Sequence, residues 1–404
     1  MLSINFILKI LFVATYFFIA LRIFVKCAFA GLYKLSKQGG NYDFANNRES
    51  LPFVSVVIPA YNASSEIVNV LGSLKKSDYP FFEIIVIDDG SIDNTVDFVE
   101  EELKDFARKV IIKLSTNQGK VTALNSGISI AQGEIVFTLD ADTIIAPKTL
   151  SLTICHMLRS NAVACACNVK IYKPRNLITM CQDIEYMTLN LERRAQAVFN
   201  LITIVPGAAS AWYRQDLIDS GGFSSRTVAE DSDMTIRLLR DGGKIIFVEE
   251  AVAYTAAPQC VEDLITQRTR WSYGSAQCIL LHWKEILSKS TWKLKYVGFP
   301  NYILSNSLRP FIPILLISLN LLLYIHGSNS FLLVGNFILL SFEIGKIIVG
   351  LFLDSSINLT HVYSVPFYLV TFPFIHLVSF LRGGVKRSAG IMFEWQSKEL
   401  KSNN

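Results

Sequence analysis

Apolar residues are concentrated at the two ends of the chain, on either side of a long region of mixed polarity. A helix that crosses a bilayer needs about 20 consecutive, mostly apolar residues. Four stretches approach or exceed that length, namely residues 4–25, 310–325, 331–353 and 362–381. We therefore expect a membrane protein whose globular part lies between the first stretch and the other three.

These runs divide the chain into distinct parts. We expect a transmembrane anchor over residues 1–30, a globular domain over 51–290, an interfacial segment over 291–309, a C-terminal transmembrane region over 310–385 and a tail over 386–404. The globular domain is long enough to bury one sizeable core.

The first apolar run is either an uncleaved anchor or a signal peptide. Ala28-Phe29-Ala30 resembles a cleavage site, but the run is long for a signal peptide, and Arg22 and Lys26 intervene before that site. We favour the anchor. We also expect the globular domain in the cytoplasm, because basic residues stay on that side of a membrane. The basic residues concerned are Arg22, Lys26, Lys34 and Lys37.

The basic tail conflicts with four full crossings. One crossing before the globular domain and three after it would leave the tail on the outer side, whereas Arg382, Lys386 and Arg387 favour the cytoplasm. Pro366 and Pro373 can break the last segment into a re-entrant or interfacial piece. The side on which the tail lies stays open at this point.

Short apolar runs alternate with helical patterns in the globular domain. Strands are expected at the start of 53–64 and in 82–91, 109–117 and 135–143, with helices from Ser64, over 119–132 and after Pro147. This alternation is typical of an α/β domain with a mostly parallel, doubly wound (Rossmann-like) sheet.

Polar side chains stand where these strands end. Asp140 and Asp142 close the run IVFTLDADT, and their spacing in a strand would point them the same way, where two carboxylates repel unless a cation lies between them. A solvated turn is the alternative. Further polar residues at such ends are Tyr61, Asn62, Asp88 and Asp89. Ligands of doubly wound sheets bind at this edge, so we expect a site there.

The sequence has neither a Gly-x-Gly-x-x-Gly motif after the first strand nor a phosphate-binding P-loop. A nucleotide diphosphate can instead be held by carboxylates through Mg²⁺ or Mn²⁺, which prefer oxygen ligands. We therefore interpret Asp140 and Asp142 as part of a metal–diphosphate clamp.

Two further stretches bear on this site. VAEDSDM places Glu230 and Asp231 just before a helix, where they are either helix-capping residues or a general base and its neighbour. Asp233 is expected to tolerate substitution by Asn. Residues 205–214 are expected to form a strand followed by a loop of small residues, which another molecule can approach closely.

The motif QRTRW lies within a helical pattern. Gln267, Arg270 and Trp271 share one helix face because residues three and four apart are neighbours. Arginine can clamp phosphate oxygens, and tryptophan offers a flat surface to a sugar ring. An amphipathic helix that lies on the membrane surface is a compatible alternative.

Composition agrees with a membrane-anchored domain. The chain is 51% hydrophobic and only 18% charged, with a mean hydropathy of +0.37, which is too apolar for an ordinary soluble protein. A net charge of +4 is too small to argue for nucleic acid. The seven cysteines show no paired framework, and we expect them to be reduced.

Taken in order, VVIPAYNA, DDGS, NQGKVTALNSG, DAD, GAAS, AED and QRTRW resemble the membrane-embedded family 2 glycosyltransferases, which include cellulose, chitin and hyaluronan synthases. The likeness covers residues 51–283 and is greatest to bacterial poly-β-1,6-N-acetylglucosamine synthases. It implies a GT-A fold, a UDP-sugar donor, a divalent metal (Mg²⁺ or Mn²⁺) and inversion at the anomeric carbon.

The resemblance also implies roles for matching residues. On the donor side, Asp89 would contact the uridine part and Lys120 would help to hold the nucleotide, with Asp140 on the diphosphate and Asp142 on the metal. Tyr61 is also expected to bind substrate.

On the acceptor side, Asp231 matches the catalytic base, with Glu230 beside it. The residues that would line the acceptor site and cap the diphosphate are Gln267, Arg270 and Trp271. The family's Thr-Glu-Asp and Asp-Gly-Asp motifs carry Ala229 and Ala141 here, which bears on acceptor preference and sugar identity.

We therefore expect a processive, inverting enzyme that transfers N-acetylglucosamine from a UDP-sugar to a growing polysaccharide. The alternatives are a non-processive enzyme that makes a lipid-linked sugar, against which QRTRW argues, and a non-catalytic nucleotide-sugar sensor. The expected location is the inner membrane, multi-pass, with the catalytic domain in the cytoplasm. The expected partners are the donor, the glycan, the bilayer and a small accessory membrane subunit, without nucleic acid.

The metal interpretation makes a direct prediction. Asp142→Asn should abolish turnover, and it should weaken UDP binding only when a divalent ion is present, because the loss acts through coordination. Transfer and UDP binding by isolated membranes, with and without the ion, measure both effects. Wild-type transfer that EDTA leaves untouched would contradict the interpretation.

Overall fold

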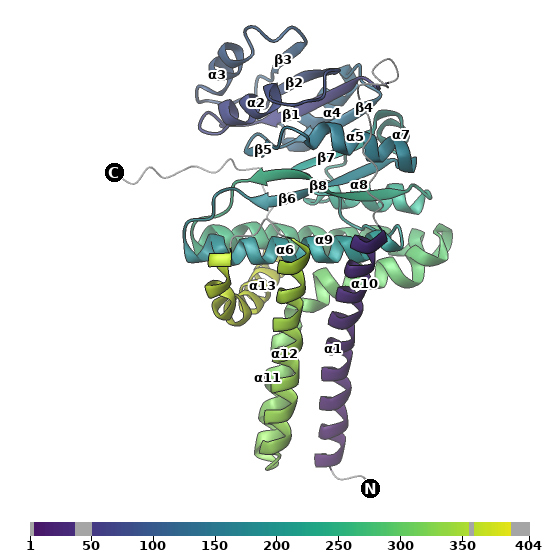
Figure 1. Ribbon diagram of the computed structural model, residues 1–404, viewed down its shortest axis with the longest axis vertical. Helices are drawn as coiled ribbons and strands as arrows, with labels where there is room; N and C mark the ends of the chain where they lie inside the picture. The colour runs from purple at the N-terminus through teal and green to yellow at the C-terminus, as the bar shows by residue number, and fades with distance from the viewer. Residues whose placement is uncertain (1–3, 37–50, 355–358, 389–404) are drawn as a thin grey trace.

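The computed structural model describes residues 4–36, 51–354 and 359–388. Figure 1 shows a globular part that rests on a base of helices, from which α1, α11 and α12 extend in a common direction. The bounds of these three helices are Ile4–Ser36, Ile312–Ile325 and Asn329–Leu353.

An eight-stranded mixed sheet forms the centre of the globular part, with the order β3-β2-β1-β4-β7-β6-β8-β5. Strands β3, β2, β1 and β4 are parallel to one another, as are β6 and β8, whereas the pairs β4–β7, β6–β7 and β5–β8 are antiparallel. The strands are β1 (Val54–Ala60), β2 (Phe82–Asp88), β3 (Lys109–Lys113), β4 (Ile135–Leu139), β5 (Thr143–Ile145), β6 (Ala164–Ile171), β7 (Ala209–Tyr213) and β8 (Ile245–Thr255).

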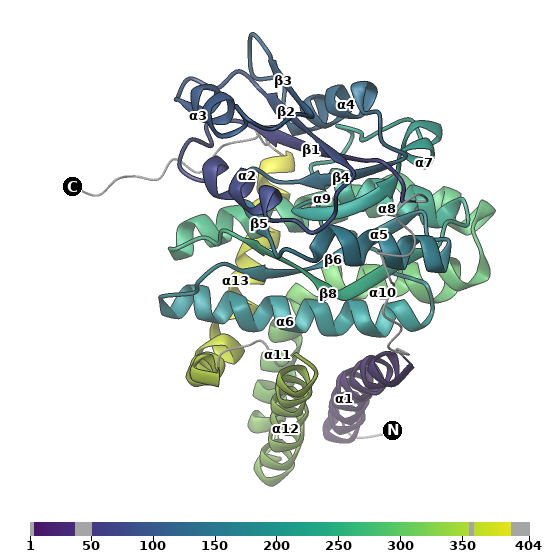
Figure 2. The same cartoon turned by 45° about the horizontal axis from the view of Figure 1, so that its top comes forward.

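Helices cover both faces of this sheet, and two long ones, α6 and α9, run along its base (Figures 1 and 2). The helices of the globular part are α2 (Ile67–Lys75), α3 (Thr95–Glu102), α4 (Lys120–Ile130), α5 (Thr149–Ser160), α6 (Leu177–Val198), α7 (Arg214–Asp219), α8 (Glu230–Arg240) and α9 (Val261–Lys289). The α/β class and the mostly parallel, doubly wound sheet are therefore confirmed, with apolar helices on the flanks of the domain.

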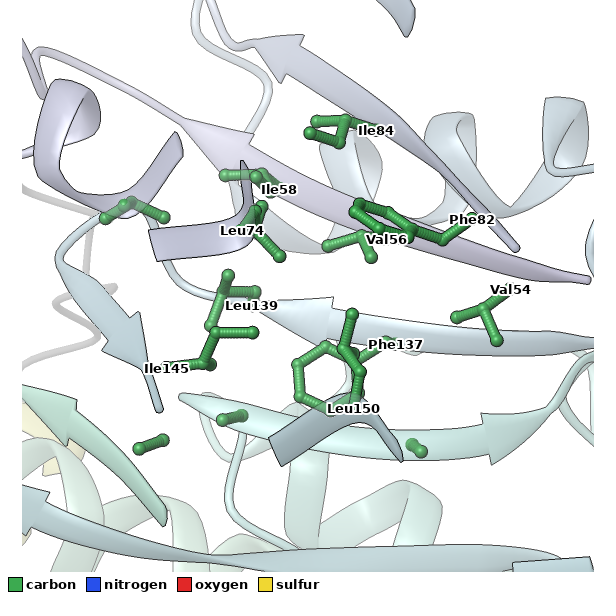
Figure 3. Packing of buried hydrophobic residues seen from close by; sticks show 14 of the residues in the cluster. Val54, Val56, Ile58, Leu74, Phe82, Ile84, Phe137, Leu139, Ile145 and Leu150 are labelled. Atoms are coloured by element: carbon green, nitrogen blue, oxygen red, sulfur yellow. The ribbon is translucent and has the colours of Figure 1, made fainter. Parts of the chain in front are cut away.

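Alternate residues of β1 enter two apolar clusters on opposite faces of the sheet. Val54, Val56 and Ile58 belong to the cluster in Figure 3, which α2 and α5 cover, whereas Val57 belongs to the cluster under α4 and α8. All seven residues of β1 are buried because both faces are covered. Such strands are continuous apolar runs, which explains why the sequence pattern located them correctly.

The amino-terminal helix α1 is tied to the base of the globular part by polar contacts. Lys26 Nζ lies 2.8 Å from Glu192 Oε2 on α6, and Arg22 Nη2 donates to Ser305 Oγ at 2.6 Å. Further along α1, Lys34 Nζ pairs with Glu249 Oε1 at 2.9 Å. Of the basic residues predicted to face the cytoplasm, Lys26 and Lys34 thus contact the globular part and Arg22 contacts the segment that follows it, whereas Lys37 lies outside the described residues.

The C-terminal region begins with irregular helical turns and ends with a long helix, α13. The elements are two π-helical turns (Leu294–Gly298 and Leu304–Leu308) around α10 (Phe299–Ile303), a 3₁₀ turn (Arg309–Phe311), α11, α12, a second 3₁₀ turn (Leu359–Ser364) and α13 (Val365–Ser388). The stretches long and apolar enough to cross a membrane are Ile4–Ser36, Leu294–Ile325, Asn329–Leu353 and His361–Val385.

The last of these stretches lies differently from the others. Figure 1 views α13 close to end-on but sees α1 and α12 along their lengths, so α13 lies across their direction. It packs on α9, where Ser379 Oγ donates to the carbonyl of Ile265 at 3.3 Å. Pro366 and Pro373 do not break the helix, because one stands in its first turn and the other is accommodated within it.

One local prediction was wrong. Residues 205–214 are a loop followed by a strand, because the small residues Gly207 and Ala208 precede β7. Since β7 runs antiparallel to β4, its amino end reaches the edge at which β4 ends. The small-residue loop therefore lies beside Asp140, whose N–H donates to the carbonyl of Ala208 at 3.0 Å.

Candidate active site

The two carboxylates that follow β4 lie in a turn rather than in the strand. β4 ends at Leu139 and β5 begins at Thr143, so Asp140 and Asp142 connect two strands. The expectation that strand alternation aligns them was wrong, because the backbone leaves the extended conformation after Leu139. They nevertheless lie close enough for the charge of Asp142 to raise the pKa of Asp140.

Lys120 connects this turn to α8. It is the first residue of α4, and its Nζ lies 2.7 Å from Asp140 Oδ1 and 3.3 Å from Glu230 Oε1. The three side chains come from positions far apart in the chain, and each is largely buried. The structure therefore brings together the predicted diphosphate-binding and catalytic residues.

The charges of this cluster change its pKa values in different directions. Burial alone lowers the pKa of Lys120, but Asp140 and Glu230 outweigh burial, and the pKa is raised. Burial also raises the pKa of Asp140, although Lys120 opposes it. For Glu230, the positive charges of Lys120 and Arg270 outweigh burial and lower the pKa. Lys120 therefore carries its positive charge throughout the accessible pH range.

Asp231, the second residue of α8, is held by backbone donors. Gly207 N–H donates to its Oδ2 at 3.0 Å and Ser232 N–H donates to its Oδ1 at 2.7 Å. Burial and the charge of Glu230 raise the pKa of Asp231 to about 6, against the opposing effect of Lys120. An ideal general base has a pKa close to the working pH, so Asp231 is suited to accept a proton.

Asp89 shapes the loop in front of α4. Its Oδ1 accepts from Gln118 N–H at 2.8 Å and its Oδ2 accepts from Gly119 N–H at 2.7 Å. Gly119 has a φ of +92°, a conformation that favours glycine. Asp89 therefore connects the end of β2 to the segment that presents Lys120. The predicted Tyr61 lies at the neighbouring end of β1, at intermediate exposure.

The donor set after β4 suits a hard divalent cation. Asp142 Oδ1 accepts from Thr143 Oγ1 at 3.1 Å and from Thr255 Oγ1 at 3.4 Å, while Asp140 is oriented by Lys120. Within the described residues, no group of three His, Cys, Asp or Glu side chains forms a complete metal site. Mg²⁺ or Mn²⁺ bound here would complete its shell with phosphate and water oxygens, as Mg²⁺ commonly does.

The residues of QRTRW lie on α9, as predicted, but they point to different neighbours. Arg270 lies close enough to affect the pKa values of Lys120 and Glu230. Trp271 lies with its ring centroid 6.3 Å from that of Tyr186 on α6. Arg270 therefore belongs with the charged cluster, whereas Trp271 borders α6.

Arg268 and Glu185 were not predicted. Arg268 lies within QRTRW but off the face shared by Gln267 and Arg270, and it is buried against Glu185 of α6. Only the unusual charge density of the motif could have signalled Arg268. Glu185 has no local signal, because its partner is 83 residues away.

Two neighbours of Asp231 are constrained by packing. A Cβ added at Gly274 of α9 would lie 2.6 Å from the Cβ of Ala229, so the small residues at these positions allow α8 and α9 to approach closely. Asp233 is fully buried, with Arg237 Nη2 at 2.8 Å and His282 Nε2 at 2.7 Å. The expectation that Asp233 tolerates Asn is therefore revised, because the substitution would leave the buried Arg237 without its counter-charge.

Comparisons with known proteins agree with this geometry. Residues 55–222 match the family model for glycosyl transferase family 2. A poly-beta-1,6-N-acetyl-D-glucosamine synthase from Staphylococcus epidermidis is 28% identical over 309 residues, which are 75% of each chain. A synthase of the same name from Staphylococcus aureus (strain COL) is 30% identical over 264 residues, which are 64% of this chain and 61% of the synthase.

A solved structure shares the fold. A mannosyltransferase from Pyrobaculum calidifontis, in complex with GDP-Man and Mn²⁺, superposes with a TM-score of 0.66 at 19% identity, covering 94% of this chain and 98% of that one. The matched family domain contains β1 to β7 and therefore the strand ends that carry Asp89, Asp140 and Asp142. The chain thus carries a glycosyl transferase family 2 domain on a GT-A fold and is a glycosyltransferase.

Proposed function

We propose that the chain is an inverting, processive polysaccharide synthase that transfers N-acetylglucosamine from its UDP donor to a growing glycan. The observation that carries the proposal is the contact of Lys120 with both Asp140 and Glu230, which joins the turn after β4 to the start of α8, where Asp231 follows Glu230. The sugar and the polymer follow from the names of the staphylococcal relatives, to which this chain is similar.

In the proposed reaction, an acceptor hydroxyl attacks C1 of the donor sugar from the face opposite the diphosphate. The new C1–O bond forms as the C1–O bond to the β-phosphate breaks, and the electron pair of the broken bond leaves with UDP. Asp231 accepts the hydroxyl proton, which its pKa of about 6 permits at neutral pH.

The leaving group gains negative charge as the bond breaks. Lys120 and Arg270 lie on that side of the cluster and stabilise this charge. A divalent cation held by Asp142 and Asp140 would supply further positive charge to the diphosphate. The mannosyltransferase that shares the fold was solved in complex with GDP-Man and Mn²⁺, which supports a divalent cofactor here.

Gln267 and Trp271 are assigned to the acceptor side. Trp271 and Tyr186 present two aromatic rings between α9 and α6, and aromatic faces suit the apolar faces of sugar rings. Asp89 is assigned to the nucleotide side, because it shapes the loop ahead of Lys120, with Tyr61 at the adjacent strand end.

We infer that α1, α11 and α12 cross the membrane and that α13 lies at its cytoplasmic surface. The direction of α13 in Figure 1, across that of α12, supports this arrangement. The two crossings that follow the globular domain, α11 and α12, return the chain to the side of that domain, where the basic Arg382 is favoured. The conflict between four crossings and a basic tail then disappears.

Asp231→Asn tests the base. Asn keeps the shape of the side chain but cannot take the proton, so sugar transfer should fall about a hundred- to ten-thousand-fold with little change in UDP affinity. Asp241→Asn, at the exposed end of the same helix, is the matched control and should leave the rate unchanged. Equal losses from the two substitutions would contradict the assignment.

The same assignment sets the pH dependence. Asp231 accepts a proton only when ionised, so kcat/KM should fall as the pH drops below about 6. Glu230→Gln removes a negative charge that raises the pKa of Asp231, so this limb should move to lower pH. A limb that moves to higher pH would show that another group is the base.

Donor identity is tested with three substrates. Membranes that contain the chain are incubated in turn with labelled UDP-N-acetylglucosamine, UDP-glucose and UDP-glucuronate, and the product is sized. Long polymer from UDP-N-acetylglucosamine alone is expected. A lipid-extractable monosaccharide product would instead support the non-processive alternative.

Cysteine labelling tests the topology. A cysteine introduced near residue 400 should react with a membrane-impermeant maleimide only after the cells are opened, as should the exposed Cys260 of the globular domain. Labelling of residue 400 in intact cells would require a fourth crossing. Labelling of Cys260 in intact cells would place the globular domain outside.

A further inference from the structure

Arg268 contacts two of the proposed acceptor-site residues, Trp271 and Gln267. Its side chain is only 1% exposed, its guanidinium carbon lies 4.0 Å from the ring centroid of Trp271, and its Nη1 donates to Gln267 Oε1. A guanidinium stacked on an indole and bonded to an amide restricts the orientation of both. Arg268 itself is therefore in a position to set the geometry of the acceptor side.

Arg268 is in turn held by a buried carboxylate. Glu185 of α6 is 2% exposed, accepts from Arg268 Nη2 through its Oε2, and lies 3.3 Å from Arg268 Nε through its Oε1. Such two-point pairing fixes the plane of the guanidinium. Although burial opposes ionisation, Arg268 and a neighbouring histidine hold the pKa of Glu185 well below its usual range. The pair is therefore ionised at any working pH.

The neighbouring histidine comes from the C-terminal helix. His376 of α13 has its Nε2 3.0 Å from Glu185 Oε1. Around His376, α13 packs closely on α9. A Cβ added at Gly383 of α13 would lie only 3.4 Å from the Cβ of Tyr273 and 3.6 Å from the carbonyl oxygen of Thr269. A helix at the end of the chain thus reaches the carboxylate that holds Arg268.

We propose that Glu185 and His376 are positioning residues for the acceptor side of the site. They act through Arg268, which orients Gln267 and Trp271, and they make α13 a part of the enzyme's binding machinery in addition to a membrane element. The inference rests on the proposed function, because it takes Gln267 and Trp271 as acceptor-binding residues. It concerns the acceptor alone, since the donor cluster around Lys120 has other neighbours.

The test uses the purified full chain in lipid nanodiscs and measures two dissociation constants, one for UDP with Mn²⁺ and one for an N-acetylglucosamine oligomer. Glu185→Gln and His376→Gln should weaken oligomer binding about tenfold and leave the Kd for UDP within about twofold. In transfer assays the same variants should raise the KM for the acceptor more than they lower kcat.

The control is His361→Gln. His361 Nδ1 lies 2.8 Å from Asp183 Oδ2, so it makes a similar contact between the C-terminal region and α6 without touching Arg268. If the C-terminal region served only to stabilise the fold, His361→Gln and His376→Gln should weaken oligomer binding equally. We expect the loss from His376→Gln only.

A double substitution tests whether His376 acts through Arg268. Arg268→Met removes the link, so adding His376→Gln to it should cause no further loss of oligomer affinity. Additive losses, or equal weakening of UDP and oligomer binding by His376→Gln, would overturn the inference while leaving the proposed function intact. A wild-type protein that binds UDP but no oligomer would overturn the acceptor assignment itself, and the inference with it.

Discussion

The ion pairs of Lys120 are the interaction on which the site depends. Asp140, Asp142, Glu230 and Asp231 gather at one sheet edge, and two unit charges 4 Å apart near a protein surface interact by about 4 kcal/mol. Lys120 offsets this repulsion because its ammonium lies within ion-pair distance of carboxylates from both groups. In the proposed reaction, diphosphate oxygens would take over the contacts that Asp140 and Glu230 make with Lys120.

A second constraint on the site comes from the helices at the base of the globular part, which link the amino-terminal helix to α9. α6 contacts α1 through Glu192 and α9 through Glu185, and α9 carries Arg270 towards the charged cluster. Two ion pairs about two turns apart thus hold α6, and loss of Arg268 from the buried pair would leave the charge of Glu185 uncompensated. One helix, α6, therefore connects the amino-terminal helix to the part of α9 that carries QRTRW.

The sequence was most informative where local patterns reflect burial or strand ends. Buried parallel strands such as β1 are continuous apolar runs, and the acids after them stood out because they interrupt such runs. It was least informative about contacts between distant segments. Glu185 and His376 have no local signal, and the direction of α13 cannot follow from hydropathy, because an apolar helix of that length can cross a membrane or lie on it. The prediction for 205–214 failed because small residues occur on either side of a strand.

Glu230 and Asp231 are adjacent carboxyls whose pKa values are shifted in opposite directions. Glu230 lies 3.3 Å from Lys120 and has a lowered pKa, so it stays ionised as a partner of the cation. Asp231 accepts hydrogen bonds from the backbone N–H groups of Gly207 and Ser232, and burial together with the charge of Glu230 raises its pKa to about 6. When the surroundings push the pKa values of two titratable groups apart in this way, one group can stay charged as an ion-pair partner while the other can accept a proton. The contact with Lys120 thus keeps Glu230 charged, and this charge adds to the effect of burial in raising the pKa of Asp231.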